Sequence, residues 1–81
     1  MDVTYSKQFR KSFATLDRIL QVRIRKVIEK LPNGDIKKLK SNHIPPIFRV
    51  RIGKYRLLFE MTEHTINVID IDSRGDIYKR I

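Results

Sequence analysis

Hydrophobic and polar side chains alternate along residues 47–59, interrupted once by glycine. Read with a period of two residues, one face is apolar and consists of Phe48, Val50, Ile52, Tyr55, Leu57 and Phe59. The opposite face carries Arg49, Arg51, Lys54, Arg56 and Leu58. Gly53 and Lys54 separate the two runs, which predicts two antiparallel strands joined by a tight turn. One face of this hairpin is expected to form a wall of the core, and the other to present cations.

The first third of the chain shows helical spacing instead. Apolar residues recur three or four positions apart in two runs, which comprise Phe9, Phe13 and Leu16, then Leu20, Ile24, Val27 and Leu31. Ser6 and Asp17 precede the runs, and each can cap a helix. Pro32 and Gly34 then end the second run. We therefore predict a helical hairpin, or one bent helix, in this part of the chain.

The other segments complete the predicted order of elements. Residues 2–5 read as a first strand, and residues 35–46 look irregular, with Leu39 as an apolar anchor. Residues 65–71 read as a strand that is buried on both faces or carries a bulge. A turn at 73–76 follows, and residues 77–81 leave room for a short last strand.

This order predicts the α+β class, with two N-terminal helices packed on one face of a small antiparallel sheet. Residues 1–81 are expected to form a single domain, because a chain of this length has no room for a second. The side chains expected to be buried between helices and sheet are Phe9, Phe13, Leu20, Ile24, Val27, Val50, Leu57 and Phe59.

The chain is strongly basic, with a formal net charge of +9, and this bears on its binding partner. Between residues 36 and 59 there are seven Lys or Arg residues and no Asp or Glu, whereas a merely solvated face usually mixes both signs. This pattern favours a polyanionic partner, most commonly nucleic acid. We expect Lys37, Lys38, Lys40 and Lys54 to add RNA affinity that does not depend on base sequence.

Several classes of protein and site are disfavoured. The chain has no cysteine, so a disulfide framework and a thiolate metal site are excluded. Its apolar runs are too short for a transmembrane helix and its first residues do not read as a signal peptide, so we expect a cytoplasmic protein without membrane contact. His43 and His64 lie in different predicted loops without carboxylate neighbours, and Asp70 with Asp72 could bind Mg²⁺ but more readily pair with arginines. We therefore expect neither a metal site nor a cofactor.

Two motifs together resemble the RelE/ParE superfamily of toxins, and its RelE branch most. The first is the run Arg49-Val50-Arg51-Ile52-Gly53-Lys54-Tyr55-Arg56, and the second is Arg74 with Tyr78 about 20 residues later. The resemblance covers nearly the whole chain. It implies a type II toxin that cleaves messenger RNA, usually on the ribosome, and that is bound by a cognate acidic antitoxin. It also implies the catalytic residues, which fall on Arg49, Arg51, Arg56, Arg74 and Tyr78.

The residues themselves suit this chemistry. Attack of a ribose 2′-hydroxyl on the neighbouring phosphorus builds negative charge, which clustered guanidinium groups stabilise. Tyr78 could take the hydroxyl proton if nearby arginines stabilise its phenolate, and Arg74 could assist the leaving oxygen. Tyr78 could equally be a sheet residue that caps the core, whereas Tyr55 is expected to be core. Many relatives place a histidine immediately before the late arginine, where this chain has Ser73.

Two other functions remain open at this point. A gyrase inhibitor of the ParE branch would share the fold, although that branch generally lacks the set formed by Arg56, Arg74 and Tyr78. A catalytically inactive module that binds only RNA or its antitoxin would also fit, because Ser73 replaces the usual histidine.

Overall fold

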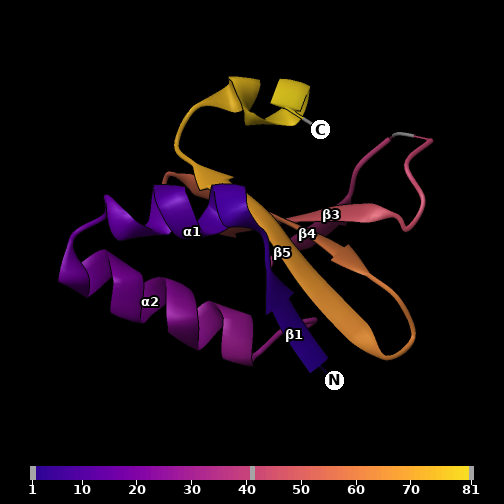
Figure 1. The fold of residues 1–81 in the computed structure, drawn as a ribbon, viewed down its shortest axis with the longest axis horizontal. Helices are drawn as coiled ribbons and strands as arrows, with labels where there is room; N and C mark the ends of the chain where they lie inside the picture. Colours follow the sequence, from indigo (N-terminus) through magenta and orange to yellow (C-terminus); the bar gives the residue numbers. More distant parts are fainter. Residues whose placement is uncertain (1, 41, 81) are drawn as a thin grey trace.

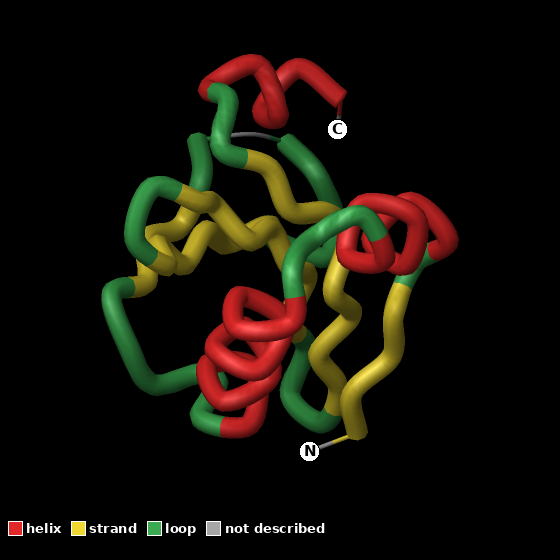
Figure 2. Tube along the Cα trace, turned by 90° about the vertical axis from the view of Figure 1, so that its left-hand side faces the viewer, coloured by secondary structure: helices red, strands yellow, loops and turns green. Residues whose placement is uncertain are grey.

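The computed structural model of the chain describes residues 2–40 and 42–80 and contains two α-helices, five strands and one 3-10 helix. In chain order these are β1 (Asp2–Tyr5), α1 (Lys7–Ala14), α2 (Arg18–Glu29), β2 (Ile36–Lys38), β3 (Ile47–Ile52), β4 (Tyr55–Met61), β5 (Thr65–Asp72) and the 3-10 helix η1 (Gly75–Arg80). Figures 1 and 2 both show η1 at the end of the molecule opposite the N-terminus. No described helix is long and apolar enough to cross a membrane.

The five strands form one sheet in the order β1-β5-β4-β3-β2. Four of them are antiparallel to their neighbours, but β1 pairs in parallel with β5, so the sheet is mixed rather than antiparallel throughout. The reason is that the chain enters β1 beside the turn before β5, where the Asp2 amide donates to the His64 carbonyl at 3.1 Å. The predicted α+β class, with helices on one sheet face, is confirmed.

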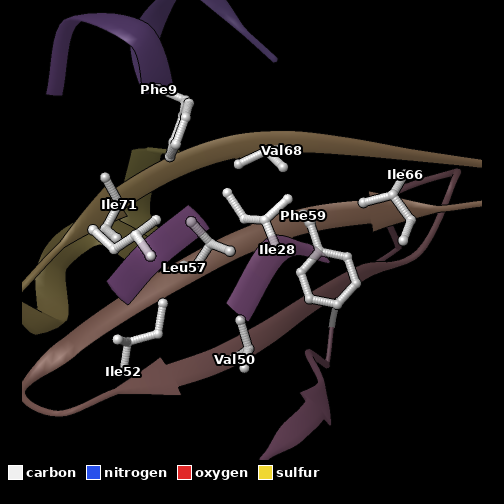
Figure 3. Packing of buried hydrophobic residues seen from close by; sticks show 10 residues of the cluster. Phe9, Ile28, Val50, Ile52, Leu57, Phe59, Ile66, Val68 and Ile71 are labelled. Carbon is white, nitrogen blue, oxygen red and sulfur yellow. The ribbon is translucent and has the colours of Figure 1, made fainter. Parts of the chain in front are cut away.

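The main core lies between the two helices and one face of the sheet (Figure 3). Its fully buried members are Phe9, Ile24, Ile28, Val50, Ile52, Leu57, Phe59, Ile66, Val68 and Ile71. Five of the eight predicted core residues are among them. The other three, Phe13, Leu20 and Val27, are only half-buried at the margin of this core, because the helices cover the sheet incompletely. Tyr55 also packs at this margin, as expected.

The predicted caps and hairpin turn are all present. The Ser6 side chain accepts from the Phe9 amide at 3.0 Å, and Asp17 Oδ1 accepts from the Leu20 amide at 2.8 Å. Gly53 has a φ of 60°, in the left-handed region that glycine adopts without strain. A Cβ built there would also lie 3.3 Å from Arg23 Nη1, which leans over the turn. These local signals fix where the elements begin and how the β3–β4 hairpin closes.

Residues 35–46 are less irregular than predicted. Residues 36–38 form β2, which pairs with β3 so that Ile36 faces Val50 and Lys37 faces Arg49. Ile36 packs at the margin of the main core and so anchors β2. With only three residues, β2 is too short to show an alternating pattern in the sequence. Leu39 does serve as an apolar anchor, although not in the main core.

A second apolar cluster lies on the cationic side of the sheet and was not predicted. Its buried members are Ile47, Leu58 and Ile77, and its half-buried members are Leu39, Ile69 and Tyr78. Ile77 comes from η1, so the predicted short strand at 77–81 is wrong for residues 77–80, which are helical; Ile81 lies outside the described residues. A 3-10 helix can place one apolar side chain onto the sheet while leaving its other residues exposed.

The irregular pattern of β5 has both predicted causes. Leu58 faces Asp70 but Phe59 faces Val68, so Ile69 is the extra residue of a β-bulge. Val68 and Ile71 belong to the main core, whereas Ile69 packs against the second cluster. The bulge therefore lets one strand supply apolar side chains to both faces.

Candidate functional site

Cross-strand pairing gathers four cations on the sheet face opposite the helices. Lys37 faces Arg49 across β2 and β3, and Arg51 faces Arg56 across β3 and β4. Side chains that face each other across strands point to the same side, so the four cations form one group. Like charges directly opposite each other destabilise a sheet. The arrangement therefore favours a bound anion that offsets the repulsion.

Arg49 carries a buried guanidinium nitrogen. Its side chain is 14% exposed, and its Nη1 atom is buried without a hydrogen-bond acceptor among the described residues. The nearest carboxylate oxygen, Oδ2 of the exposed Asp35, is 3.9 Å away, which is beyond hydrogen-bond distance. Because a buried donor without an acceptor costs stability, an anionic oxygen beside Nη1 would be stabilising.

Arg56 connects this group to the C-terminal segment. Its Nη1 atom donates to the Ser73 carbonyl at 3.1 Å, and its Cζ atom lies 5.9 Å from the centre of the Tyr78 ring. Tyr78 is held there because its neighbour Ile77 is fully buried in the second cluster. Arg56 therefore lies between the sheet cations and the tyrosine, in contact with both parts of the site.

These residues line an open cleft of about 530 Å³. Its wall consists of Lys37, Lys38, Leu39, Lys40, Arg49, Arg51, Arg56 and Tyr78. Six of these are lysines or arginines, and among the described residues no carboxylate lines the cleft. The cleft thus brings together four of the five predicted catalytic residues and three of the four predicted RNA-binding lysines.

Arg74 and Lys54 lie elsewhere. Arg74 is exposed, with Nε 3.7 Å from Asp72 Oδ1, and it lines a separate hollow beside α1. Lys54 sits in the β3–β4 turn with Nζ 5.9 Å from the centre of the Tyr55 ring, beside the start of α2. The hairpin alternation could not reveal this, because a turn residue leaves the face of the strand that precedes it.

Sequence reasoning missed two groups that shape the site. Ile77 positions Tyr78, and the Ser73 carbonyl positions Arg56. The available signal was Ile77 itself, an apolar residue next to the tyrosine in a segment rich in charged residues. The backbone carbonyl leaves no signal in the sequence, since any residue supplies one.

Histidines and aspartates form no metal cluster in residues 2–40 and 42–80, where no three such side chains come together. The prediction that the histidines lack carboxylate neighbours was wrong. His43 Nδ1 lies 3.6 Å from Glu60 Oε2, and His64 Nε2 lies 3.9 Å from Glu63 Oε2. Asp70 is buried and accepts from the Ser12 hydroxyl at 3.2 Å, so it serves packing between α1 and β5.

Comparisons with known proteins agree with this fold and cleft. The chain is 31% identical to Toxin RelE3 of Methanocaldococcus jannaschii, over 96% of either chain. A crystal structure of a RelB–RelE antitoxin–toxin complex from Methanococcus jannaschii contains a chain that superposes with a TM-score of 0.75 at 27% identity, covering 96% of this chain and 98% of that one. An archaeal RelE–RelB complex from Pyrococcus horikoshii gives a TM-score of 0.72 at 24% identity, over 91% and 94%. No protein-family profile matches the chain.

The helical hairpin on a five-stranded sheet, with a cationic cleft on the uncovered face, defines a small toxin of the type II toxin–antitoxin class. Within that class the chain belongs to the RelE family, because it is 31% identical to a RelE toxin over almost its whole length.

Proposed function

We propose that this toxin is an endoribonuclease that cleaves messenger RNA by attack of a 2′-hydroxyl on the adjacent phosphorus, without a metal ion. The observation that carries the proposal is the cross-strand placement of Arg51 against Arg56 and of Lys37 against Arg49, beside a buried Arg49 donor that lacks an acceptor. A sheet that tolerates this repulsion is suited to a phosphate.

The residues of the cleft have separate proposed roles in the cleavage reaction. Arg49, Arg51 and Arg56 bind the scissile phosphate and stabilise the charge that its oxygens gain in the pentacoordinate transition state. As the bond from the 2′-oxygen to phosphorus forms, Tyr78 acts as the general base that takes the 2′-hydroxyl proton. The bond from phosphorus to the 5′-oxygen breaks, and the leaving oxygen takes a proton from water, because Arg74 lies outside the cleft. The products are a 2′,3′-cyclic phosphate and a 5′-hydroxyl.

The proposed partners follow from charge and from the relatives. Two structural neighbours are complexes with RelB, which supports an acidic antitoxin as the partner of this chain, whose net charge is +9. The substrate is messenger RNA on the ribosome, because the cleft offers cations and one tyrosine but no second general acid in a fixed position. A ribosome that orients the RNA would supply that missing alignment. The compartment is then the cytoplasm.

The end groups of the RNA products test this mechanism. The wild-type protein, incubated with translating ribosomes, is expected to yield fragments with a 5′-hydroxyl and a 2′,3′-cyclic or 3′-phosphate. Tyr78→Phe should slow the same cut by about 10²–10⁴-fold, because it removes the proposed base and keeps the ring against Arg56. Labelling of 5′ ends with and without prior phosphatase treatment distinguishes the products.

A matched control is Tyr5→Phe, since Tyr5 is exposed at the edge of the sheet and does not line the cleft. It should cleave as the wild type does. Fragments with a 5′-phosphate would instead indicate attack by water, and the mechanism would be wrong. A wild-type protein that cuts no RNA but blocks gyrase would replace the proposal with the ParE-like function.

The lysines of the cleft should contribute through charge alone. Lys37, Lys38 and Lys40 are exposed along one wall, where they can contact RNA phosphates outside the scissile one. Replacing all three by Gln is expected to reduce the slope of log affinity against log salt by about two to three, if each contacts a phosphate. Filter binding of a single-stranded RNA over a salt series measures the slope, and an unchanged slope would place this wall away from the RNA.

A further inference from the structure

A second hollow of about 390 Å³ lies between α1 and the end of β5. Figure 1 shows the segment that follows β5 passing α1 before it reaches η1. The helix and its C-cap contribute Gln8, Lys11 and Thr15 to the hollow, and the segment that follows β5 contributes Ser73 and Arg74. The proposed cleavage reaction uses none of the helix residues.

The two cations of this hollow are available to an external anion. Lys11 is exposed and forms no ion pair with any described carboxylate. The Arg74 side chain is 73% exposed, and its only described ion pair joins Nε to Asp72 Oδ1 at 3.7 Å, which leaves the two terminal nitrogens open to another acceptor. With Asp72 counted, the hollow still carries a net positive charge, so it favours a phosphate over a carbonyl or a cation.

The neighbouring polar groups are hydrogen-bonded to one another or to the backbone, and they form a rigid floor of the hollow. The Thr15 hydroxyl donates to the Ser12 carbonyl at 2.7 Å, and Gln8 Nε2 donates to Ser12 Oγ at 3.3 Å. Ser12 Oγ donates in turn to the buried Asp70. This chain of bonds fixes the turn of α1 that carries Lys11.

The hollow lies on the helix side of the sheet and the cleft on the opposite side, and a hydrogen bond at the end of the sheet links their linings. Arg56 lines the cleft, and the Ser73 carbonyl that accepts its hydrogen bond at 3.1 Å belongs to a residue that lines the hollow. A strand of RNA that rounds the end of the sheet at Arg56 and Ser73 would therefore reach from one group of cations to the other. Single-stranded nucleic acids bind to cationic surfaces through their phosphates.

We propose that Lys11 and Arg74 form a second phosphate-binding subsite, which holds the RNA strand next to the segment in the cleft. The inference rests on the proposed function, since it assumes that the cleft binds RNA. It gives Arg74 a contact with substrate outside the cleft. It also gives α1 a role in substrate binding that its amphipathic pattern does not suggest.

Binding of RNA of two lengths tests the subsite. We suggest 2′-O-methyl RNA, which cannot undergo attack by its own 2′-hydroxyl, in lengths of about 4 and about 12 nucleotides. For the longer RNA, Lys11→Gln should lower the slope of log affinity against log salt by about one, and Lys11→Gln with Arg74→Gln by about two. For the shorter RNA, which fills only the cleft, the slope should stay at the wild-type value. Lys26→Gln is the control, because Lys26 is exposed on α2 and lines neither hollow.

The possible outcomes distinguish a failure of the proposed subsite from a failure of the proposed function. If the wild type binds both lengths and the Lys11→Gln slope matches that of Lys26→Gln, the subsite does not exist while the cleft proposal stands. An equal loss for both lengths would also overturn the subsite, because Lys11 would then act within the cleft. If the wild-type chain binds RNA of neither length, both proposals fail.

Discussion

Replacing Arg56 by alanine is expected to slow cleavage of ribosome-bound messenger RNA by about 10²–10³-fold, which corresponds to roughly 3–4 kcal/mol of transition-state stabilisation. Arg56 faces Arg51 across the sheet and also contacts the C-terminal segment, through the Ser73 carbonyl at 3.1 Å and the Tyr78 ring, whose centre is 5.9 Å from its Cζ atom. Its loss removes a charge from the phosphate and also releases the segment that carries the tyrosine. Single-turnover cleavage at saturating protein measures the effect.

Two further arginine variants sharpen this experiment. Arg56→Lys retains the positive charge but lacks the planar guanidinium group, which can donate to the Ser73 carbonyl and to a phosphate at the same time. It should therefore recover only part of the cleavage rate that is lost in Arg56→Ala. Arg23→Ala removes an exposed arginine of α2 that lies beside Gly53 but does not line the cleft, and it should cleave as the wild type does. If Arg56→Ala and Arg23→Ala cleave alike, Arg56 has no part in the reaction. Thermal melts of each variant show whether the fold is kept.

The sequence was sufficient for those parts of the fold that depend on local signals. Ser6 and Asp17 cap the two helices where their side chains predict, and Gly53 makes the hairpin turn. The alternation along residues 47–59 also gave the correct register, since Val50 and Leu57 are buried while Arg51 is exposed. Register fixes which side chains share a face, so the sequence alone predicts that three cations of the cleft, Arg49, Arg51 and Arg56, lie together.

The parts that depend on distant contacts could not be predicted in the same way. Only long-range pairing shows that β1 runs parallel to β5 and that three residues of the presumed loop form β2. Arg74 was grouped with the arginines of the cleft, but the turn after β5 directs it toward α1. The second cluster could not be predicted because its members, Leu58 among them, come from five separate segments and lie on the face assigned to cations.

That second cluster leads to the other large effect, which we expect from Ile77→Ala. Removing a buried isoleucine side chain typically costs about 2–5 kcal/mol. Here most of this cost should fall on the docking of η1, because Ile77 is the only fully buried side chain that η1 contributes among residues 75–79. Once η1 undocks, Tyr78 leaves the Arg56 guanidinium, and cleavage should fall at least as far as in Tyr78→Phe. Amide hydrogen exchange within residues 75–80 should accelerate in parallel.

A matched substitution in the main core distinguishes local undocking from a general loss of stability. Ile24 is as fully buried as Ile77 but lies in α2, on the opposite side of the sheet from the cleft. Ile24→Ala should therefore lower the melting temperature more than Ile77→Ala does, yet cleave at nearly the wild-type rate well below that temperature. Ile77→Leu, which keeps the side-chain volume, should recover most of the cleavage lost in Ile77→Ala. If Ile77→Ala cleaves normally while exchange at residues 75–80 rises, the position of Tyr78 is irrelevant to the reaction, and the base must be sought among the other residues of the cleft.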